Sequence, residues 1–240
     1  MNQVWQARVD LAAAYRLAVR FGFHEGIDNH FTLTVPGSPD RFLLNAFGLH
    51  WSEVTASNLL VVDSKGRVVE GEGEAETTAV CIHAPIHQTN PRAACIMHTH
   101  MPYATALSML EGGRLEPASQ TSLRFYDGVA YDEEYNGLAM QQDEGERLCK
   151  VLDGKRVLLM ANHGVTVVGA SVAEAFEDLY FFERACQAQF IAQQSGKPLK
   201  YVPTQIAQST FRGMDNARDA ALHFSALKRM LDREEPGYAQ

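Results

Sequence analysis

Two histidines stand two residues apart at the end of an apolar run, in the segment IMHTHMPYATALS of residues 96–108. On a β-strand, residues at i and i+2 share a face, so the imidazoles of His98 and His100 would lie side by side. His163, in LLMANHGV, ends another apolar run and precedes a glycine that would let the backbone turn the ring toward a cleft. Three neutral imidazoles with an open position are typical of a catalytic metal site.

The spacing alone leaves a second interpretation open, in which these are strand histidines that only pack or form hydrogen bonds. A cupin-type site also uses His-x-His, but it expects a glutamate a few residues later. Here the next four residues are Met, Pro, Tyr and Ala, which weakens that alternative.

The composition is that of an ordinary soluble globular protein, with 240 residues, 46% of them hydrophobic and 21% charged. The net charge of −8 argues against nucleic acid as a partner, because phosphate binding needs a basic surface. No basic run, membrane-spanning stretch or signal peptide is evident, so no membrane partner is expected. Four scattered cysteines without a C-x-x-C motif fit a reduced, cytoplasmic protein.

The elements that must position the histidines are a mixture of hairpins and helices. Strand-like pairs are expected in HFTLTVPG with RFLLNAFG, in LLVVDSKGRVVEG and in VLLMANHGVTVVG, and another strand in ACIMHTH. Helices are expected over residues 4–21, over 75–89, from Pro102, and from an S-x-x-E capping box at Ser171 to about Gln194. This order predicts a mixed α/β domain rather than a doubly wound parallel sheet.

The segment GKPLKYVP at residues 196–203 is interpreted as a break. We therefore expect one domain over 1–200 and a C-terminal helical extension over 201–240. The extension carries an apolar stripe at helical spacing, which would pack on the domain or on a neighbouring subunit; its members are Ala220, Phe224, Leu227 and Leu231.

Several ordered segments together resemble the class II aldolase/adducin family over roughly residues 8–200. They are GLHWSEVTASNLLVVDSKGRVVEG, ACIMHTHMPYATALS and VLLMANHGVTVVGASVAEAFE. The resemblance implies a three-layer α/β/α fold with a central, largely antiparallel mixed sheet, and a homotetramer with active sites between subunits. It also implies a carbon–carbon lyase or related enzyme acting on a small carboxylate or hydroxy-carbonyl; adducin-type members are structural.

In catalytic members of the family, the histidines of the HTH and NHG motifs hold a divalent metal. Residue by residue, these are His98, His100 and His163. The resemblance therefore implies one divalent ion per subunit, zinc or manganese first, with iron or cobalt as alternatives.

The chain departs from the family at the base. Aldolases carry an acidic residue nineteen positions before the first HTH histidine, where this chain has Ala79, and Thr77 and Thr78 replace the preceding serines. Glu76 lies one helical turn earlier and shares a face with His83. Glu76 is a candidate base, or it only favours the helix start through the helix dipole.

The family's phosphate loop, GNxS, is altered to DNHFT at residues 28–32. His30 is therefore a candidate for anion binding or proton transfer, and a structural hydrogen-bond role stays open. The tyrosine proton donor of some aldolases also lacks a counterpart, with Thr121 near its position. Tyr126 and Tyr131 are close in sequence; Tyr131 is taken as a catalytic candidate, and a packing role for both stays open.

The missing acid, with the metal histidines kept, favours decarboxylation of a hydroxy- or keto-carboxylate, aromatic ones included, because carbon dioxide leaves without a base. His30, His83 or Arg124 would orient the carboxylate or supply a proton, and Thr77 and Thr78 are further substrate-binding candidates. The alternative is an aldolase that cleaves a small hydroxy-carbonyl or sugar with Glu76 as base. A non-catalytic, adducin-like scaffold ranks third.

Overall fold

The computed structural model describes residues 2–214 and 216–240. Within these residues, eight strands form one sheet in the order β4-β3-β2-β1-β5-β8-β7-β6. Every neighbouring pair is antiparallel except β6 and β7. The strands are β1 (His30–Val35), β2 (Ser38–Leu44), β3 (Leu60–Asp63), β4 (Val68–Glu70), β5 (Cys95–Thr99), β6 (Val129–Asp132), β7 (Val157–Met160) and β8 (Gly164–Gly169). The predicted central, largely antiparallel mixed sheet is confirmed.

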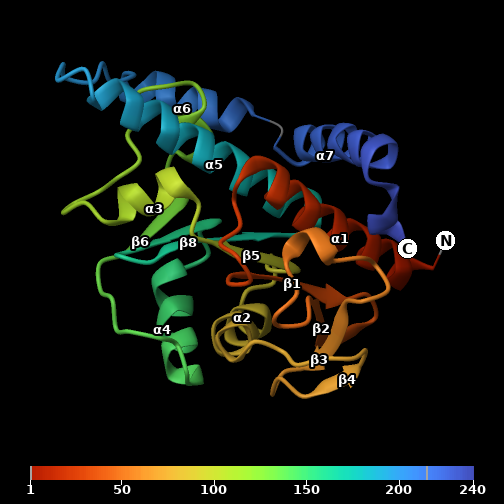
Figure 1. Ribbon diagram of the computed structural model, residues 1–240. Helices are drawn as coiled ribbons and strands as arrows, with labels where there is room; N and C mark the ends of the chain where they lie inside the picture. Colours follow the sequence, from red (N-terminus) through yellow and green to blue (C-terminus); the bar gives the residue numbers. More distant parts are fainter. Residues whose placement is uncertain (1, 215) are drawn as a thin grey trace.

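Helices cover both faces of the sheet and complete the three layers (Figure 1). One face carries α1 (Gln3–Phe21), α3 (Pro102–Ser108), α5 (Val172–Gln193), α6 (Thr204–Gly213) and α7 (Asn216–Glu234), and the other carries α2 (Thr77–Thr89) and α4 (Gln142–Leu152). Three short 3-10 turns lie at Trp51–Glu53 (η1), Ser122–Phe125 (η2) and Pro236–Ala239 (η3).

The larger core fills the layer between the sheet and helices α1 and α5. Its most bulky members are fully buried aromatic side chains, among them Tyr15, Phe31 and Trp51. Such rings remove large apolar areas from water, and Tyr15 also has a polar end. Its hydroxyl accepts a hydrogen bond from the backbone N–H of Phe31 (2.9 Å), which ties α1 to the start of β1.

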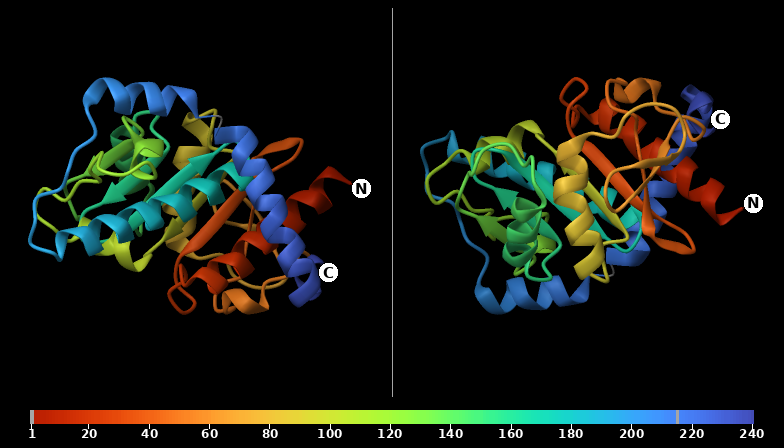
Figure 2. Two further views of the ribbon diagram at one scale, coloured as in Figure 1. Left: turned by 90° about the horizontal axis from the view of Figure 1, so that it is seen from above. Right: turned by 90° about the horizontal axis from the view of Figure 1, so that it is seen from below.

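On the opposite face, α2 and α4 lie side by side across the sheet (Figure 2, right). Gly145 of α4 faces the backbone of α2 so closely that a Cβ there would clash with the carbonyl oxygen of Cys81. Glycine is required because only it permits this approach. The contact fixes α2, which carries His83 and follows directly on Glu76, above the middle of the sheet.

The C-terminal helices return to the body of the same chain. The predicted stripe of Ala220, Phe224, Leu227 and Leu231 is buried, and its last three residues join the core with α1 and α5. Beyond α7, the backbone N–H of Ala56 donates to the carbonyl of Tyr238 (2.9 Å). The predicted extension therefore packs on its own domain, while the boundary at residue 200 stays a prediction. None of the described helices is long and apolar enough to cross a bilayer.

Candidate metal centre and active site

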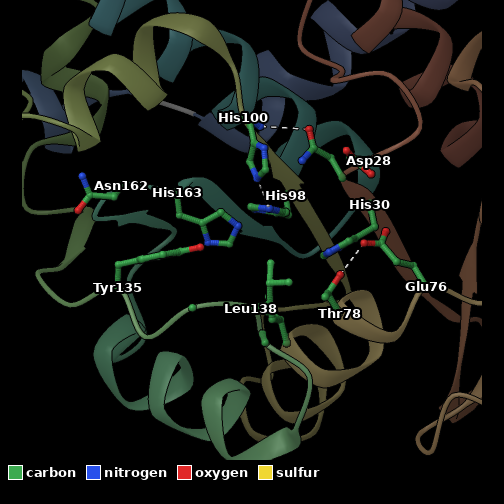
Figure 3. Close-up of a pocket in the computed structure, with 14 residues that line it drawn as sticks. Asp28, His30, Glu76, Thr78, His98, His100, Tyr135, Leu138, Asn162 and His163 are labelled. Atoms are coloured by element: carbon green, nitrogen blue, oxygen red, sulfur yellow. Dashed lines mark hydrogen bonds between the residues drawn. The ribbon is translucent and has the colours of Figure 1, made fainter.

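Two adjacent strands bring the three predicted metal ligands together. His98 lies near the end of β5, His100 follows that strand, and His163 stands in the tight turn between β7 and β8. Because β5 pairs with β8, the turn lies beside the end of β5. The nitrogens that could coordinate an ion all lie within 4.8 Å of one another, so the structure brings these three side chains together (Figure 3).

Gly164 permits this convergence for a reason other than the predicted one. The left-handed residue of the turn is Asn162 (φ 56°), and Gly164 does not have a positive φ. Instead, a Cβ at Gly164 would lie 2.6 Å from the carbonyl oxygen of Thr99 and 2.8 Å from Cδ2 of His100. The glycine therefore leaves room for the imidazole of His100.

In two of the three rings, Nδ1 is already engaged in a hydrogen bond, which leaves Nε2 to bind an ion. His98 Nδ1 donates to the carbonyl of Val165 (3.1 Å), and His100 Nδ1 is hydrogen-bonded to the carboxylate of Glu25. The two Nε2 atoms lie 3.2 Å apart. Ligands of a tetrahedral zinc ion would be roughly 3.4 Å apart at a Zn–N distance of about 2.1 Å, so the residues fit a divalent metal.

Burial also keeps the imidazoles in the form that binds metal. It lowers the pKa of His163 to about 4, with a further contribution from neighbouring His100. Burial likewise holds the pKa of His98 well below its ordinary value. Both rings are neutral at pH 7, and a neutral imidazole is the ligand form of histidine.

The sequence profile described as "Class II Aldolase and Adducin N-terminal domain" matches residues 9–190. This chain belongs to the class II aldolase and adducin family. A Pseudomonas aeruginosa protein, provisionally named a class 2 aldolase, is 36% identical over 98% of this chain and 93% of its own length. Human beta-adducin is 34% identical over 94% of this chain, which spans only 33% of that protein.

Solved structures agree with the family assignment and with the fold. An aldolase II superfamily protein from Pseudomonas syringae is 37% identical and superposes with a TM-score of 0.93, covering 100% of this chain and 97% of the other. The L-fuculose 1-phosphate aldolase of Glaciozyma antarctica is 26% identical with a TM-score of 0.87, over 99% and 93% of the two chains. Class II aldolases are generally metal-dependent lyases, which agrees with the histidine cluster.

The three histidines line a cavity of about 380 Å³. Two of the predicted catalytic residues, Glu76 and His30, also line it, as does Thr78 (Figure 3). None of the described residues that line it is a lysine or arginine, whereas Asp28 and Glu76 add two carboxyl groups. Apart from the histidines and Tyr135, the ionisable side chains among these described lining residues are thus both carboxylic acids.

Glu76 precedes the first turn of α2 but does not cap the helix with its side chain. Its carboxylate instead accepts a hydrogen bond from the hydroxyl of Thr78 (2.5 Å) at the cavity wall. Burial raises the pKa of Glu76, which makes it a stronger base than an exposed glutamate. Thr77 is exposed outside the cavity, and Ala79 packs against Phe42 and Leu44.

His30 and His83 are neighbours, but only His30 reaches the cavity. His30 is paired in register with His98 across β1 and β5, with ring centroids 5.0 Å apart. His83 is fully buried behind it, with ring centroids 4.5 Å apart, and its Nδ1 is hydrogen-bonded to the hydroxyl of Thr32. The structure does not bring His83 to the cavity, so its contact with the site runs through His30.

The structure also leaves Arg124 and Tyr131 outside the cavity. Arg124 donates to the buried carboxylate of Glu177 (2.5 Å). The ring of Tyr131 packs toward the core beneath α5, because strand alternation turns it to that face of β6, and its hydroxyl accepts from the backbone N–H of Leu115 (3.1 Å). The guanidinium of Arg124 and the hydroxyl of Tyr131 thus form structural hydrogen bonds within the chain.

Sequence reasoning missed several described residues at the site, four of which bear on its chemistry or shape. Glu25 holds His100, and the cavity wall includes Tyr135, Leu138 and Asn162. The ring of Tyr135 lies 6.2 Å from that of His163. All four stand in turns or in the loop of residues 133–141, where no periodic pattern shows which way a side chain points.

Proposed function

We propose that this family member is a divalent-metal-dependent lyase that cleaves a small, unphosphorylated hydroxy-carbonyl compound by a retro-aldol reaction. The observation that carries the proposal is that the carboxyl group of Glu76 lines the same cavity as the three histidines. The sequence favoured decarboxylation because Ala79 occupies the aligned position of the base. Glu76, one turn earlier, supplies a carboxylate at the cavity, so the lack of an acid at position 79 no longer favours decarboxylation.

His98, His100 and His163 would hold the ion, with zinc or manganese as the proposed metal. When bound, a divalent ion acts as a Lewis acid that withdraws electron density from a substrate oxygen. Glu25 and the carbonyl of Val165 orient two of the three rings through their Nδ1 atoms. This support would leave Nε2 of His98 and of His100 available to hold the ion.

Glu76 would remove the proton from the hydroxyl group of the carbon that is cleaved off. As that O–H bond breaks, a carbonyl forms on the same carbon and the carbon–carbon bond breaks. The electron pair of the broken bond is delocalised toward the carbonyl of the other fragment, and a proton must then be returned to its carbon. Tyr135 offers a hydroxyl group at the cavity for that transfer, and Thr78 orients Glu76.

The charges of the cavity support an unphosphorylated substrate. A phosphate group is usually held by arginine, lysine or a row of backbone N–H groups. The described lining contains two carboxyl groups and neither basic residue type, and His30 stands in the altered phosphate loop. The Glaciozyma antarctica enzyme is named for a sugar phosphate, and we propose that this chain acts on a different, uncharged substrate class.

A paired-product assay tests this proposal. Metal-loaded protein would be incubated with hydroxy-carbonyl compounds, their phosphate esters, and hydroxy- or keto-carboxylates, while carbonyl products and carbon dioxide are measured together. We expect carbonyl product without carbon dioxide. Glu76→Gln should lower kcat by roughly 10²- to 10⁴-fold, and the exposed neighbour Glu74→Gln should retain activity.

Decarboxylation is the second candidate, favoured by Ala79 at the aligned position. Release of carbon dioxide that persists in Glu76→Gln and disappears in His98→Ala would establish it and overturn the aldol proposal. A scaffold, as the adducin part of the family suggests, is the third candidate. The scaffold would be favoured if the natural protein bound no divalent metal and if His98→Ala changed neither metal binding nor product release.

We also propose a cytoplasmic homotetramer, as the family resemblance implies. Large apolar side chains near the end of α5 and in the following segment are exposed in the single chain, including Phe190, Ile191, Tyr201 and Ile206. An exposed group of this kind supports an interface between copies. Light scattering coupled to size exclusion would give the mass directly, and a mass of one subunit would contradict this assembly.

A further inference from the structure

A row of polar side chains runs away from the cavity between β1 and α2. His30, Thr32 and Thr34 share one face of β1 because they alternate along the strand. His83 and His87 share the facing side of α2 because they are four residues apart. Their surroundings are apolar, since Phe42 stacks on His87 with ring centroids 4.4 Å apart. Leaving one of these buried polar groups without a hydrogen bond therefore costs considerable free energy of folding.

The far end of the row has a fixed direction. His87 Nδ1 lies 2.6 Å from the carbonyl oxygen of Ala93, which can only accept, so Nδ1 carries the proton. Burial lowers the pKa of His87 to about 4, so the ring is neutral at pH 7 and its Nε2 is an acceptor. The hydroxyl of Thr32, 2.7 Å away, donates its only hydrogen to that nitrogen.

The same logic sets the tautomer of the next ring. With its hydrogen directed at His87, the oxygen of Thr32 must accept from Nδ1 of His83, which lies 2.8 Å away. Burial holds the pKa of His83 well below its ordinary value, so this ring is also neutral. Its Nε2 then carries a lone pair, and this buried atom has no hydrogen-bond partner among the described residues.

His30 also has a buried nitrogen that lacks a hydrogen bond within the described chain. Its Nδ1 is buried and is likewise without a partner among the described side chains and backbone. The rings of His30 and His83 are nearly perpendicular, at 74°, with centroids 4.5 Å apart. Two lone pairs on neighbouring buried rings would repel, whereas one proton between them would satisfy both atoms.

We propose that Nδ1–H of His30 turns to donate to Nε2 of His83, a bond that is not formed between the two rings as they stand, so that His87, Thr32 and His83 fix the tautomer of His30. In that tautomer Nε2 of His30 is an unprotonated acceptor at the cavity, where it binds a hydroxyl group of the substrate (Figure 3). His30 is then a substrate-binding residue, while Thr32, His83 and His87 are positioning residues that act through it. The substrate contact rests on the proposed lyase function, but the tautomer does not.

The test is nuclear magnetic resonance of the full chain labelled with ¹⁵N-histidine. Long-range ¹H–¹⁵N correlations distinguish the two neutral tautomers of each ring, and His30→Gln and His83→Gln variants assign the signals. We expect the Nδ1–H tautomer for both His30 and His83 in the natural sequence. An Nε2–H tautomer for His30 would overturn the proposal.

Three threonine variants show whether the row sets that tautomer. Thr32→Val removes the relaying hydroxyl and should change the ¹⁵N pattern of His83 and His30, whereas Thr32→Ser keeps the hydroxyl and should retain it. Thr34→Val is the matched control, because its hydroxyl lies 3.3 Å from Nδ1 of His87, whose proton already goes to Ala93. A His30 pattern that is the same in Thr32→Val as in the natural sequence would overturn the positioning role.

Kinetics on a substrate that the protein turns over tests the second half of the proposal. Thr32→Val should lower kcat/KM by roughly 10- to 100-fold, the usual cost of losing a partner that orients a functional imidazole. Thr32→Ser and Thr34→Val should stay near the natural value. A changed tautomer with unchanged kcat/KM would overturn the substrate contact of His30. The tautomer result is read without substrate, so it stands or falls independently of the lyase assay.

Discussion

The carboxylate of Glu25 is hydrogen-bonded to Nδ1 of His100, 75 residues later in the chain. The bond directs Nε2 of His100 toward the other two ligands. Glu25→Gln keeps the size of the side chain and removes its charge, so we expect metal affinity to fall by roughly 10- to 100-fold. Calorimetric titration of the metal-free protein measures this change. Glu72→Gln, an exposed control, should bind metal as the natural protein does, and equal affinity in Glu25→Gln would show that Glu25 is not required.

Stability should depend on pH through His87. Burial lowers its pKa to about 4 in the folded chain, whereas an unfolded histidine titrates near 6.5. The unfolded state then binds more protons between these values, so the stabilising contribution is complete above about pH 6.5 and is lost progressively toward pH 4. Urea unfolding between pH 4 and 7.5 checks this, because His87→Gln should have a shallower pH dependence. Equal slopes for both proteins would contradict the prediction.

Gly164→Ala should disturb the metal site without touching a ligand. The added Cβ would meet the carbonyl of Thr99 and Cδ2 of His100, and relieving such overpacking typically costs about 1–3 kcal/mol. We expect a lower midpoint of thermal unfolding together with weaker metal binding. Gly213→Ala is the control, because a Cβ there would have no heavy atom within 4 Å. Undiminished metal affinity in Gly164→Ala would mean that the site adjusts to the extra methyl group.

The two tyrosines near the end of β6 should differ in their effect on turnover. Tyr135→Phe removes the hydroxyl at the cavity, and we expect kcat to fall by roughly 10²-fold if it returns the proton to carbon. Tyr131→Phe removes an acceptor for the N–H of Leu115, so it should cost about 1 kcal/mol of stability and leave kcat near its natural value. The opposite ranking in kcat would restore Tyr131 as the catalytic candidate.

The sequence alone was sufficient to predict the helices and strands whose signals are local. The β1–β2 and β3–β4 hairpins follow alternating patterns bounded by turn residues, and Ser171 accepts a hydrogen bond from the N–H of Glu174 as the start of α5 requires. The histidine cluster was also within reach, because His-x-His and Asn-His-Gly stand at the ends of clear apolar runs. Glu76 was placed by helical periodicity relative to His83.

The positions of the remaining site residues depend on strand order and on loop conformation, which local sequence patterns do not encode. The neighbouring strands β1, β5 and β8 come from distant parts of the chain, and this order is what places His30 beside His98. Tyr131 was entered as a candidate because it lies close in sequence to the expected donor, and Tyr135 was not considered. One faces the core from β6 and the other lies in a loop at the cavity, a difference that a few residues of strand length decide.

The three proposed metal ligands and part of the cavity wall come from different parts of the fold. The metal ligands come from the central strands, whereas Tyr135 and Leu138 come from the exposed loop that joins β6 to α4 near the edge of the sheet. None of the three histidines lies in that loop. Under the proposed function, substitutions in this surface loop would alter which substrate fits while the three metal ligands are kept.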